Sequence, residues 1–393
     1  MTDSITNDPV AAATELAPQI RAAREYIQSE CAFPSRLVEG MAQGNLFQLY
    51  VPKSIGGPET DPITAFRAVE ELSKADGSVG WCAAVAGAIS MYAAWVPAKV
   101  GLELFGQPLD IRAAGSFRPT ADARKIDGGY KIGGRWNYVS GSDHANWLVL
   151  NSNIVNGDGQ FTTPVLDTQG NPVTRLMIVP RSAAVVERTW STLGMRGTGS
   201  NDVVIEEAFV ADEHTCLLYD PPTINGPLYD RRTVSAISWT LMAANALGMA
   251  RGAMDTFVHL ATSSGTTTTP VLMRDRTAVQ TTVGEAEAII GAARAYVLDS
   301  VGSMWEAACQ AITDPGPRVL HTRLAITHAM RESVRAVDLL YYAAGTNAIH
   351  ESNELELYFR DLHTAGQHIA GLHSNFEYGG QVLLGLPPGG SGW

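Results

Sequence analysis

Residues 124–141 read RKIDGGYKIGGRWNYVSG, and this stretch decides the fold class of the chain. Its apolar and polar residues alternate on both sides of Asp127-Gly128-Gly129, which is the pattern of a β-hairpin. Four further strand-like runs follow, separated by turn residues: NWLVLNSNIV, TRLMIVP, AAVVERTW and SNDVVIEEAFV. Together these runs predict an antiparallel, barrel-like β-domain over residues 113–220.

The sequence on either side of this β-zone is helical. Residues 1–112 contain ELAPQIRAAREYIQSECA and DPITAFRAVEELSK, in which apolar residues recur at helical spacing. The second run begins with Asp61 and Pro62, a capping residue followed by a first-turn proline. Residues 221–393 contain three long runs with apolar stripes and few breakers, which are typical of a helical bundle. The chain is therefore predicted to be mainly α, with an N-terminal helical domain, a central β-domain and a C-terminal helical bundle.

Composition excludes several classes of partner. The 393 residues carry a net charge of −12, and lysine and arginine form no clusters, so neither a nucleic acid nor an anionic membrane is expected to bind. The uncharged stretch 80–98, GWCAAVAGAISMYAAWVPA, consists mostly of Ala, Gly and Ser and is interrupted by Pro97. We therefore expect a buried helix pair there, and not a membrane span.

The four cysteines indicate a reducing compartment. Cys31, Cys82, Cys216 and Cys309 form no CxxC pair, no zinc pattern and no disulfide framework, so buried free thiols are expected. The N-terminus shows neither the basic nor the apolar region of a signal peptide. The expected location is the cytoplasm.

Two turns are candidate ligand-binding segments. No GxGxxG or GxxxxGK[ST] fingerprint is present, but residues 194–200 read GMRGTGS, whose small side chains let amides and hydroxyls approach a flat ring or a phosphate. Residues 136–142, WNYVSGS, place aromatic rings and a hydroxyl at the end of a strand, where they could contact a planar cofactor. Taken singly, each segment could equally be an ordinary turn.

The histidines near the C-terminus do not predict a metal site. His363, His368 and His373 recur at intervals of five, whereas ligands on one helix face need spacings of three or four. An imidazole that faces an apolar pocket would instead serve as a general acid or base.

Four segments together resemble the flavoproteins of the acyl-CoA dehydrogenase fold: residues 45–82, 129–150, 190–214 and 359–368. The resemblance covers nearly the whole chain in the right order. It implies an N-terminal helical domain, an antiparallel β-barrel-like domain, a C-terminal four-helix bundle and a homotetramer with flavin bound between these parts.

The resemblance is closer to the oxygenases of this fold than to the dehydrogenases. Dehydrogenases have a glutamate base shortly after the Arg-Asp pair, but here Arg360-Asp361 is followed by Gly366-Gln367-His368, and Glu377 comes two turns later. A histidine at His368 is similar to the two-component aromatic hydroxylases, as are Ser140-Gly141 and the 194–200 loop. This implies reduced FAD (FMN possible) made by a separate NAD(P)H-dependent reductase, dioxygen as co-substrate, and hydroxylation of a small phenolic, indolic or polycyclic aromatic through a flavin C4a-hydroperoxide.

The resemblance also assigns roles to residues. His368 would exchange a proton during hydroxylation, and Ser140 would form a hydrogen bond near flavin N5. The other flavin-binding residues would be Trp136, Tyr138, Gly141, Arg196, Thr198 and Ser200, with Arg274 and Arg276 neutralising the phosphates of a neighbouring subunit's cofactor. Substrate would contact Trp81, Phe117 and Trp239, although each of these could also be a core residue.

Three other functions stay open at this point. The chain could be an acyl-CoA dehydrogenase or oxidase with Glu377 or another carboxylate as its base, an N- or S-oxygenase of the same fold, or a scaffold that has lost catalysis.

Overall fold

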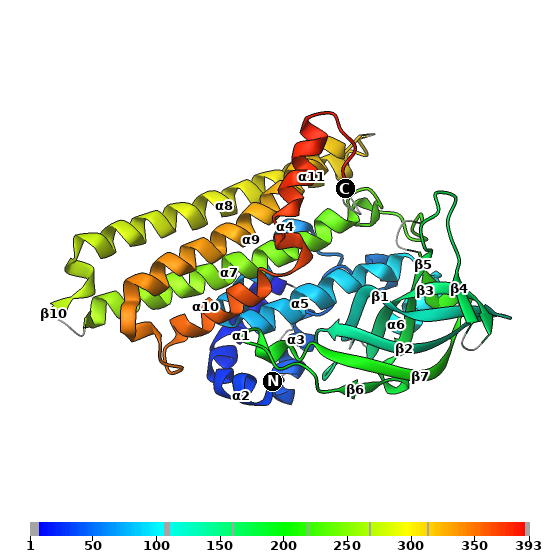
Figure 1. Ribbon diagram of the computed structural model, residues 1–393, viewed down its shortest axis with the longest axis horizontal. Coiled ribbons are helices and arrows are strands. Elements are labelled where there is room, and N and C mark those ends of the chain that lie inside the picture. Colours follow the sequence, from blue (N-terminus) through cyan, green and yellow to red (C-terminus); the bar gives the residue numbers. More distant parts are fainter. Residues whose placement is uncertain are drawn as a thin grey trace.

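The computed structural model describes residues 8–105, 111–158, 161–217, 220–266, 269–312 and 314–389. Its three parts follow one another along the long axis (Figure 1). The sheet lies at one end, three long helices extend side by side to the other end, and the N-terminal helices lie against both.

The N-terminal part is helical, as predicted. Its helices are α1 (Pro9–Ala22), α2 (Arg24–Glu30), α3 (Ser35–Gln43), α4 (Pro62–Ala75), α5 (Gly77–Ser90) and α6 (Ala98–Phe105). The predicted start of α4 is confirmed, because the Asp61 carboxylate accepts hydrogen bonds from the N–H groups of Ile63 and Thr64, each at 3.0 Å.

Helix α5 is the central helix of the molecule. It continues into the 3₁₀ turn η2 (Met91–Ala94), and it packs against α4, against α7 (Val234–Ser263) and against strand β1 (Ala113–Ile126). By length and composition, residues 77–94 could cross a membrane, but 89% of this window is buried inside the fold. The stretch is therefore the core helix that its small residues predict, and it brings the bundle and the sheet together.

The central domain is one mixed sheet. Its strands are β1, β2 (Gly129–Val139), β3 (Trp147–Asp158), β4 (Phe161–Pro164), β5 (Thr174–Pro180), β6 (Val185–Glu187), β7 (Asn201–Ala211) and β8 (Thr215–Cys216). They are ordered β6-β7-β2-β1-β3-β5-β8, and β4 pairs with β3. The hairpin of β1 and β2 forms where it was predicted.

The prediction that all strands are antiparallel was wrong for one pair. After β2 the chain crosses over through residues 140–146 and returns on the other side of β1, so β3 runs parallel to β1. Period-two alternation identifies a strand but not its neighbour, so the sequence did not reveal this crossover. The crossover matters because it places Ser140 and Gly141 at the edge of the sheet that faces α5.

The C-terminal part is the expected four-helix bundle. Helices α7, α8 (Thr277–Cys309), α9 (Gly316–Ala344) and α10 (Glu354–Ala365) pack against one another, and α11 (Ser374–Leu383) lies outside them on α9 (Figure 1). A two-stranded ribbon, β9 (Gly265–Thr266) and β10 (Thr269–Leu272), joins α7 to α8 at the end far from the large sheet.

The four cysteines are free, as expected, but they are not all buried. Cys82 and Cys216 are buried, Cys31 is partly accessible and Cys309 is exposed. The prediction of buried thiols was therefore wrong for Cys309, which ends α8, a helix that covers one side of the bundle and faces solvent along part of its length.

Candidate active site

The two turns selected from the sequence form one site. Ser140 and Gly141 directly follow β2, and the Gly141 N–H donates to the carbonyl oxygen of Thr198, 2.8 Å away, in the 194–200 loop. Gly141 has φ +80°, and a Cβ at this position would lie 3.0 Å from His144 Nε2. The turn therefore needs a glycine both for its left-handed backbone and for the close approach of His144.

Three buried hydroxyls connect these turns. The Oγ atoms of Ser140 and Ser200 are 2.7 Å apart, and Ser200 Oγ is 2.7 Å from Thr198 Oγ1. Thr198 Oγ1 donates to the carbonyl oxygen of Met195 at 2.8 Å. Because a hydroxyl carries a single hydrogen, Ser200 must donate to Thr198 and Ser140 must donate to Ser200. The chain of hydroxyls consequently has one direction, from Ser140 to Met195.

Helix α5 supplies the first donor of this chain. The indole N–H of Trp81 donates to Ser140 Oγ at 3.2 Å. With its own hydrogen directed at Ser200, Ser140 keeps one oxygen lone pair with which to accept a further hydrogen bond. Trp81 and Ser200 thus orient the Ser140 hydroxyl directly, and Thr198 and Met195 orient it through Ser200.

The ring of His368 lies against the ring of Trp81. The two rings meet edge to face, with centroids 5.3 Å apart and planes at 82°. His368 caps the short η9 turn (Ile369–Gly371) and its Nδ1 accepts the N–H of Ala370 at 3.2 Å. Segments from the N-terminal helices, the sheet and the C-terminal part thereby converge on a single tryptophan.

The protonation state of His368 follows from its surroundings. Burial lowers the pKa of His368 to about 4, so the imidazole is neutral near pH 7. Since Nδ1 accepts a hydrogen bond, the hydrogen of the neutral ring is on Nε2. His368 is therefore a hydrogen-bond donor through Nε2 at neutral pH.

The loop is also fixed to the bundle by groups that the sequence reasoning did not select. Asp361 Oδ1, on α10, accepts the N–H of Met195 at 2.5 Å, and Arg360 Nη1 donates to the carbonyl of Leu193 at 2.6 Å. Asp361 was noted only as half of an Arg-Asp pair. His144 was also missed: its ring stacks on Phe33 at a centroid distance of 5.2 Å and is tilted against Phe47 at 5.3 Å, and its Nε2 lies close to Gly141.

Two other predicted flavin contacts lie near this site. Arg196, in the η4 turn (Arg196–Thr198), donates through Nε to the carbonyl oxygen of Gln28 at 3.1 Å. Tyr138 is 56% exposed and lies edge-on to Trp190 at 6.2 Å. Both stay predictions, because their positions neither require nor prevent contact with a ligand.

The prediction for Trp136 was wrong. Its ring is completely buried in the core of the sheet, and its indole N–H donates to the carbonyl of Asn151 at 2.7 Å. The alternation of β2 is interrupted between Trp136 and Val139, where the register with β7 shifts and Tyr138 has φ +60°. Tyr138 is therefore exposed although it lies two residues after the buried Trp136. With its ring inside the sheet core, Trp136 cannot contact a bound ring.

The predicted substrate residues separate into two groups. Trp81 is part of the site itself, while Phe117 packs against Tyr92 of the η2 turn at 5.6 Å. Trp239, on α7, lies under the guanidinium of Arg323 of α9, 5.1 Å from its ring centroid. Phe117 is 42% exposed, so it could contact a substrate that extends from the site along β1.

Arg274 and Arg276 lie apart from Ser140 within this chain. Arg274 lies within the η7 turn (Met273–Asp275) and Arg276 directly follows it, next to β10, at the end of the bundle opposite the sheet (Figure 1). Any contact they make with flavin would therefore involve another subunit, as the resemblance implies.

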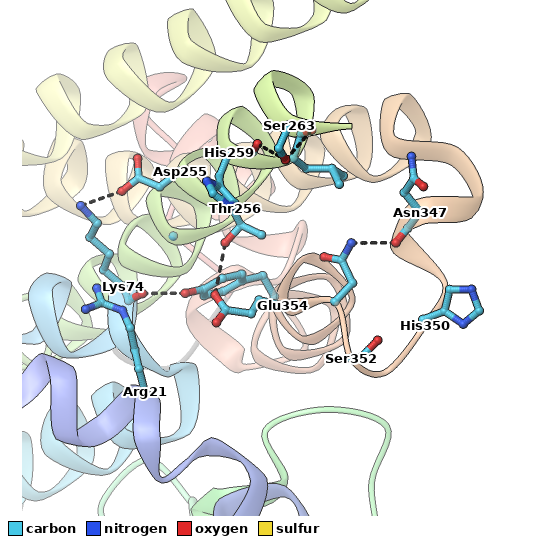
Figure 2. A pocket seen from close by; sticks show the side chains of 14 residues that line it. Arg21, Lys74, Asp255, Thr256, His259, Ser263, Asn347, His350, Ser352 and Glu354 are labelled. Carbon is cyan, nitrogen blue, oxygen red and sulfur yellow. Dashed lines mark hydrogen bonds and ion pairs between the residues drawn. The ribbon is translucent and has the colours of Figure 1, made fainter. Parts of the chain in front are cut away.

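A separate cavity of about 580 Å³ lies beside the C-terminal part of α7 (Figure 2). Its wall includes Lys74, Asp255, His259, His350, Glu354 and Tyr358, and none of the predicted site residues. Lys74 pairs with Asp255 at 2.8 Å, as Figure 2 shows. The cavity thus has charges of both signs and is distinct from the site around Trp81. Within the described residues, no group of three His, Cys, Asp or Glu side chains could hold a metal ion.

Comparison with known proteins identifies matches over the whole length of the chain. Residues 10–98 match the acyl-CoA dehydrogenase N-terminal domain, and residues 240–371 match the acyl-CoA dehydrogenase C-terminal domain. Indole-3-acetate monooxygenase of Pseudomonas putida is 30% identical over 352 residues, which are 90% of this chain and 87% of that protein. The oxygenase subunit HsaA, a flavin-dependent monooxygenase of Rhodococcus jostii, is 26% identical over 90% of this chain and 92% of its own. The solved structure of XiaF from Streptomyces sp., in complex with FADH2 and glycerol, superposes with a TM-score of 0.87 at 27% identity, covering 97% of this chain and 96% of that one.

Proposed function

Since this chain belongs to the acyl-CoA dehydrogenase family and its relatives are oxygenases, we propose that it hydroxylates an indolic or phenolic substrate. It is a flavin-dependent monooxygenase that uses reduced flavin and dioxygen. Indole-3-acetate monooxygenase supports the indolic class, and the aromatic rings of Trp81, Tyr92 and Phe117 would suit a flat apolar substrate.

One observation carries the proposal beyond family membership. The arrangement of Trp81, Ser140 and His368 contains a hydroxyl acceptor and a neutral imidazole, and no carboxylate takes part in it. The N5 atom of a reduced flavin bears a hydrogen, whereas N5 of an oxidised flavin has only a lone pair. The remaining lone pair of Ser140 can accept from the first but cannot donate to the second. The residues therefore fit a flavin that arrives reduced.

The side chains have distinct tasks in this reaction. When bound, reduced flavin supplies the electrons that activate dioxygen, so that one oxygen atom reaches the substrate and the other leaves as water. Ser140 would accept a hydrogen bond from the cofactor's ring edge, and Trp81 fixes the orientation of that hydroxyl. His368 donates through Nε2 and can steady negative charge on an oxygen of the reacting groups. Gly141 lets the turn pass close to His144, and Thr198 and Ser200 hold Ser140 in place.

Glu377, the base named for the dehydrogenase alternative, does not face the site around Trp81. Glu377 is exposed on α11 and accepts a hydrogen bond from Gln381 of the same helix at 3.4 Å. A general base must reach the proton that it removes, so an outward-facing carboxylate does not serve this role.

A stopped-flow experiment tests the proposed function. Protein loaded anaerobically with reduced FAD is mixed with oxygenated buffer containing indole-3-acetate, indole or a simple phenol, with ¹⁸O₂ in a parallel run. We expect an absorbing transient before oxidised flavin returns, and one ¹⁸O atom in the product. Immediate reoxidation without labelled product for any of these compounds would contradict the proposal. Bleaching of bound oxidised flavin by an acyl-CoA, without any reductase, would instead establish the dehydrogenase.

An N- or S-oxygenase of the same fold is the remaining alternative. The same labelled reaction with an aromatic amine and a thiophene distinguishes it, because the label would then appear on nitrogen or sulfur. Activity on these compounds in the absence of ring hydroxylation would replace the proposed substrate class.

The assembly and the partners are part of the proposal. We expect a separate NAD(P)H-dependent flavin reductase and a cytoplasmic location, for which the four free thiols are a supporting observation. A homotetramer is supported by exposed apolar side chains at the end of α11 and just after it, including Leu383, Leu384 and Leu386. In that tetramer Arg274 and Arg276 would reach a neighbouring subunit's flavin phosphates. Light scattering coupled to gel filtration measures the mass, and a monomer would contradict this part.

A further inference from the structure

Two aspartates are buried together behind the active-site loop. Asp76 and Asp361 are both 0% exposed, one at the start of α5 and the other on α10. Asp76 Oδ1 caps α5 by accepting the N–H groups of Ser78 and Val79 at 2.9 and 3.2 Å. Asp361 Oδ1 accepts the N–H of Met195. The second carboxyl oxygen of each residue, Oδ2, has no hydrogen-bond partner among the described residues.

The unpartnered oxygen of Asp361 lies beside the residue that follows Asp76. A Cβ placed on Gly77, the residue after Asp76, would lie 3.1 Å from Asp361 Oδ2, so this oxygen faces the first turn of α5. Burial and the neighbouring Asp76 carboxyl raise the pKa of Asp361 to about 7, and burial also raises the pKa of Asp76. Two adjacent carboxylates in a buried site disfavour double ionisation, which is the arrangement in which one proton is shared.

The charged groups around the pair do not neutralise it fully. Arg24 of α2 is close to Asp76, but its guanidinium also pairs with Glu354 at 2.6 Å and donates to the Tyr358 hydroxyl at 2.5 Å. Arg360 of α10 pairs with Glu356. The remaining titratable neighbour is Cys82 on α5, which is itself deeply buried. With each nearby arginine already paired to a glutamate, the two aspartates are left with two uncompensated negative charges, and a shared proton removes one of them.

The pair acts on the active site through Met195. Met195 has φ +55°, a left-handed conformation that a side chain rarely adopts. Its N–H is held by Asp361, and its carbonyl receives the hydroxyl of Thr198, the last member of the chain that begins at Trp81 and Ser140. The same peptide segment is pressed against α10, because a Cβ on Gly194 would come within 2.2 Å of the Arg360 carbonyl oxygen.

We propose that Asp76 and Asp361 share one proton, and that this pair positions Met195 and thereby sets the direction of the hydroxyl chain that begins at Ser140. The pair is a positioning device and does not touch the reacting atoms. The sharing of a proton by Asp76 and Asp361 does not depend on the proposed function. Only the effect of this pair on flavin binding at Ser140 rests on that function.

Asparagine substitutions give a result that a purely structural role does not. In Asp361→Asn, the amide Oδ1 still accepts from Met195 while Nδ2 donates to Asp76 Oδ2, so the variant imitates the protonated acid. Asp76→Asn likewise imitates the protonated acid, with the amide now on Asp76. In the double variant both amide oxygens are already engaged, and two NH₂ groups face each other. Each single variant should therefore fold well, and the double variant should melt several degrees below either of them.

The pH profile supplies the second readout. A carboxyl whose pKa is higher in the folded state than its usual value stabilises the fold below that usual value, and this stability is lost as pH rises through the folded-state pKa. The melting temperature of the parent should therefore fall between about pH 4 and pH 7, from the usual carboxyl pKa up to the folded-state pKa of Asp361, and this fall should be smaller in each single variant. Asp255→Asn, which removes the exposed carboxyl paired with Lys74, is the control and should keep the parent's profile.

Hydrogen exchange and infrared spectra complete the test. Peptides that contain Met195 should exchange faster in the double variant than in either single variant, and reduced-FAD affinity should fall in parallel. The parent near pH 6 should show a protonated carboxylic acid C=O band that both single variants lack. The proposal is overturned if the parent has no such band, if Asp361→Asn retains the parent's pH dependence, or if the double variant is no less stable than the weaker single variant. None of these three outcomes depends on hydroxylase activity.

Discussion

The indole N–H of Trp81 donates to the hydroxyl oxygen of Ser140 at 3.2 Å, and this bond joins the central helix α5 to the end of strand β2. Because Ser140 in turn donates to Ser200, the tryptophan sets which lone pair of Ser140 remains available. A residue of the helical part thus decides how a residue of the sheet can meet a cofactor.

Ser140→Ala should weaken the binding of reduced FAD. The change removes the acceptor of the Trp81 N–H and the acceptor offered to the cofactor, and a neutral hydrogen bond contributes about 0.5–1.5 kcal/mol, which corresponds to a loss of roughly two- to tenfold in affinity. An anaerobic titration measures this. Ser152→Ala is the matched control: Ser152 is buried in β3 with an unpartnered hydroxyl, so its loss should leave affinity unchanged. Equal affinities for Ser140→Ala and the parent would remove Ser140 from the site.

The two tryptophans should respond in opposite ways to substitution by phenylalanine. Trp136→Phe leaves the Asn151 carbonyl without its donor inside the sheet, so stability should fall by about 1–3 kcal/mol while flavin affinity is kept. Trp81→Phe should lower flavin affinity and leave stability nearly unchanged, because Trp81 is only partly buried. Urea unfolding and the flavin titration, run on both variants, check the pair. A loss of flavin affinity in Trp136→Phe would restore Trp136 as a flavin-binding residue.

Hydroxylation should show no histidine titration between about pH 5.5 and pH 8, because burial holds the pKa of His368 at about 4. A histidine whose pKa is lowered in the folded state stabilises the fold above its usual pKa, and this stability is lost as pH falls toward 4. His368→Gln retains an N–H donor and should keep more product per flavin oxidised than His368→Ala, with flavin binding similar in both. A pH-dependent step near 6.5 that disappears in His368→Gln would show that the imidazole works as a base instead.

Gly141→Ala should cost more stability than Gly128→Ala. Both positions have positive φ, +80° and +73°, so each substitution carries the left-handed penalty of about 1–2 kcal/mol. A Cβ at 141 also meets His144 Nε2 at 3.0 Å, whereas a Cβ at 128 meets nothing within 4 Å. Thermal unfolding compares the two, and only Gly141→Ala should also lower reduced-flavin affinity. Equal effects on both measurements would indicate that the turn tolerates a side chain beside His144.

Local features of the structure could be predicted because their causes are local. The cap at Asp61, the hairpin turn at Gly128 and the long helices α7, α8 and α9 each depend on residues within a few positions of one another. Turn chemistry, capping and periodicity act over that range. The same reasoning selected Ser140, Thr198 and Ser200 as polar residues in turns.

Three features depended on contacts between distant segments. The sequence does not show which of Trp81 and Trp136 is a core residue. In the structure, β2 directs Trp136 into the sheet core, whereas α5 directs Trp81 to the site. The parallel pairing of β1 with β3 follows from a crossover and not from any strand's own pattern. Asp76 and Asp361 come together only because α5 and α10 pack around the 194–200 loop.

The sequence by itself determined the elements, their order and the chemistry available at each turn, since hydrogen bonding and burial along a helix or strand are governed by neighbouring residues. Tertiary structure alone decided which of those groups meet, which tryptophan is core, how the hydroxyls are oriented and how two acids share a buried space. Burial, the direction of a hydrogen bond and the pKa of a carboxyl all depend on which groups from the rest of the chain replace water around it.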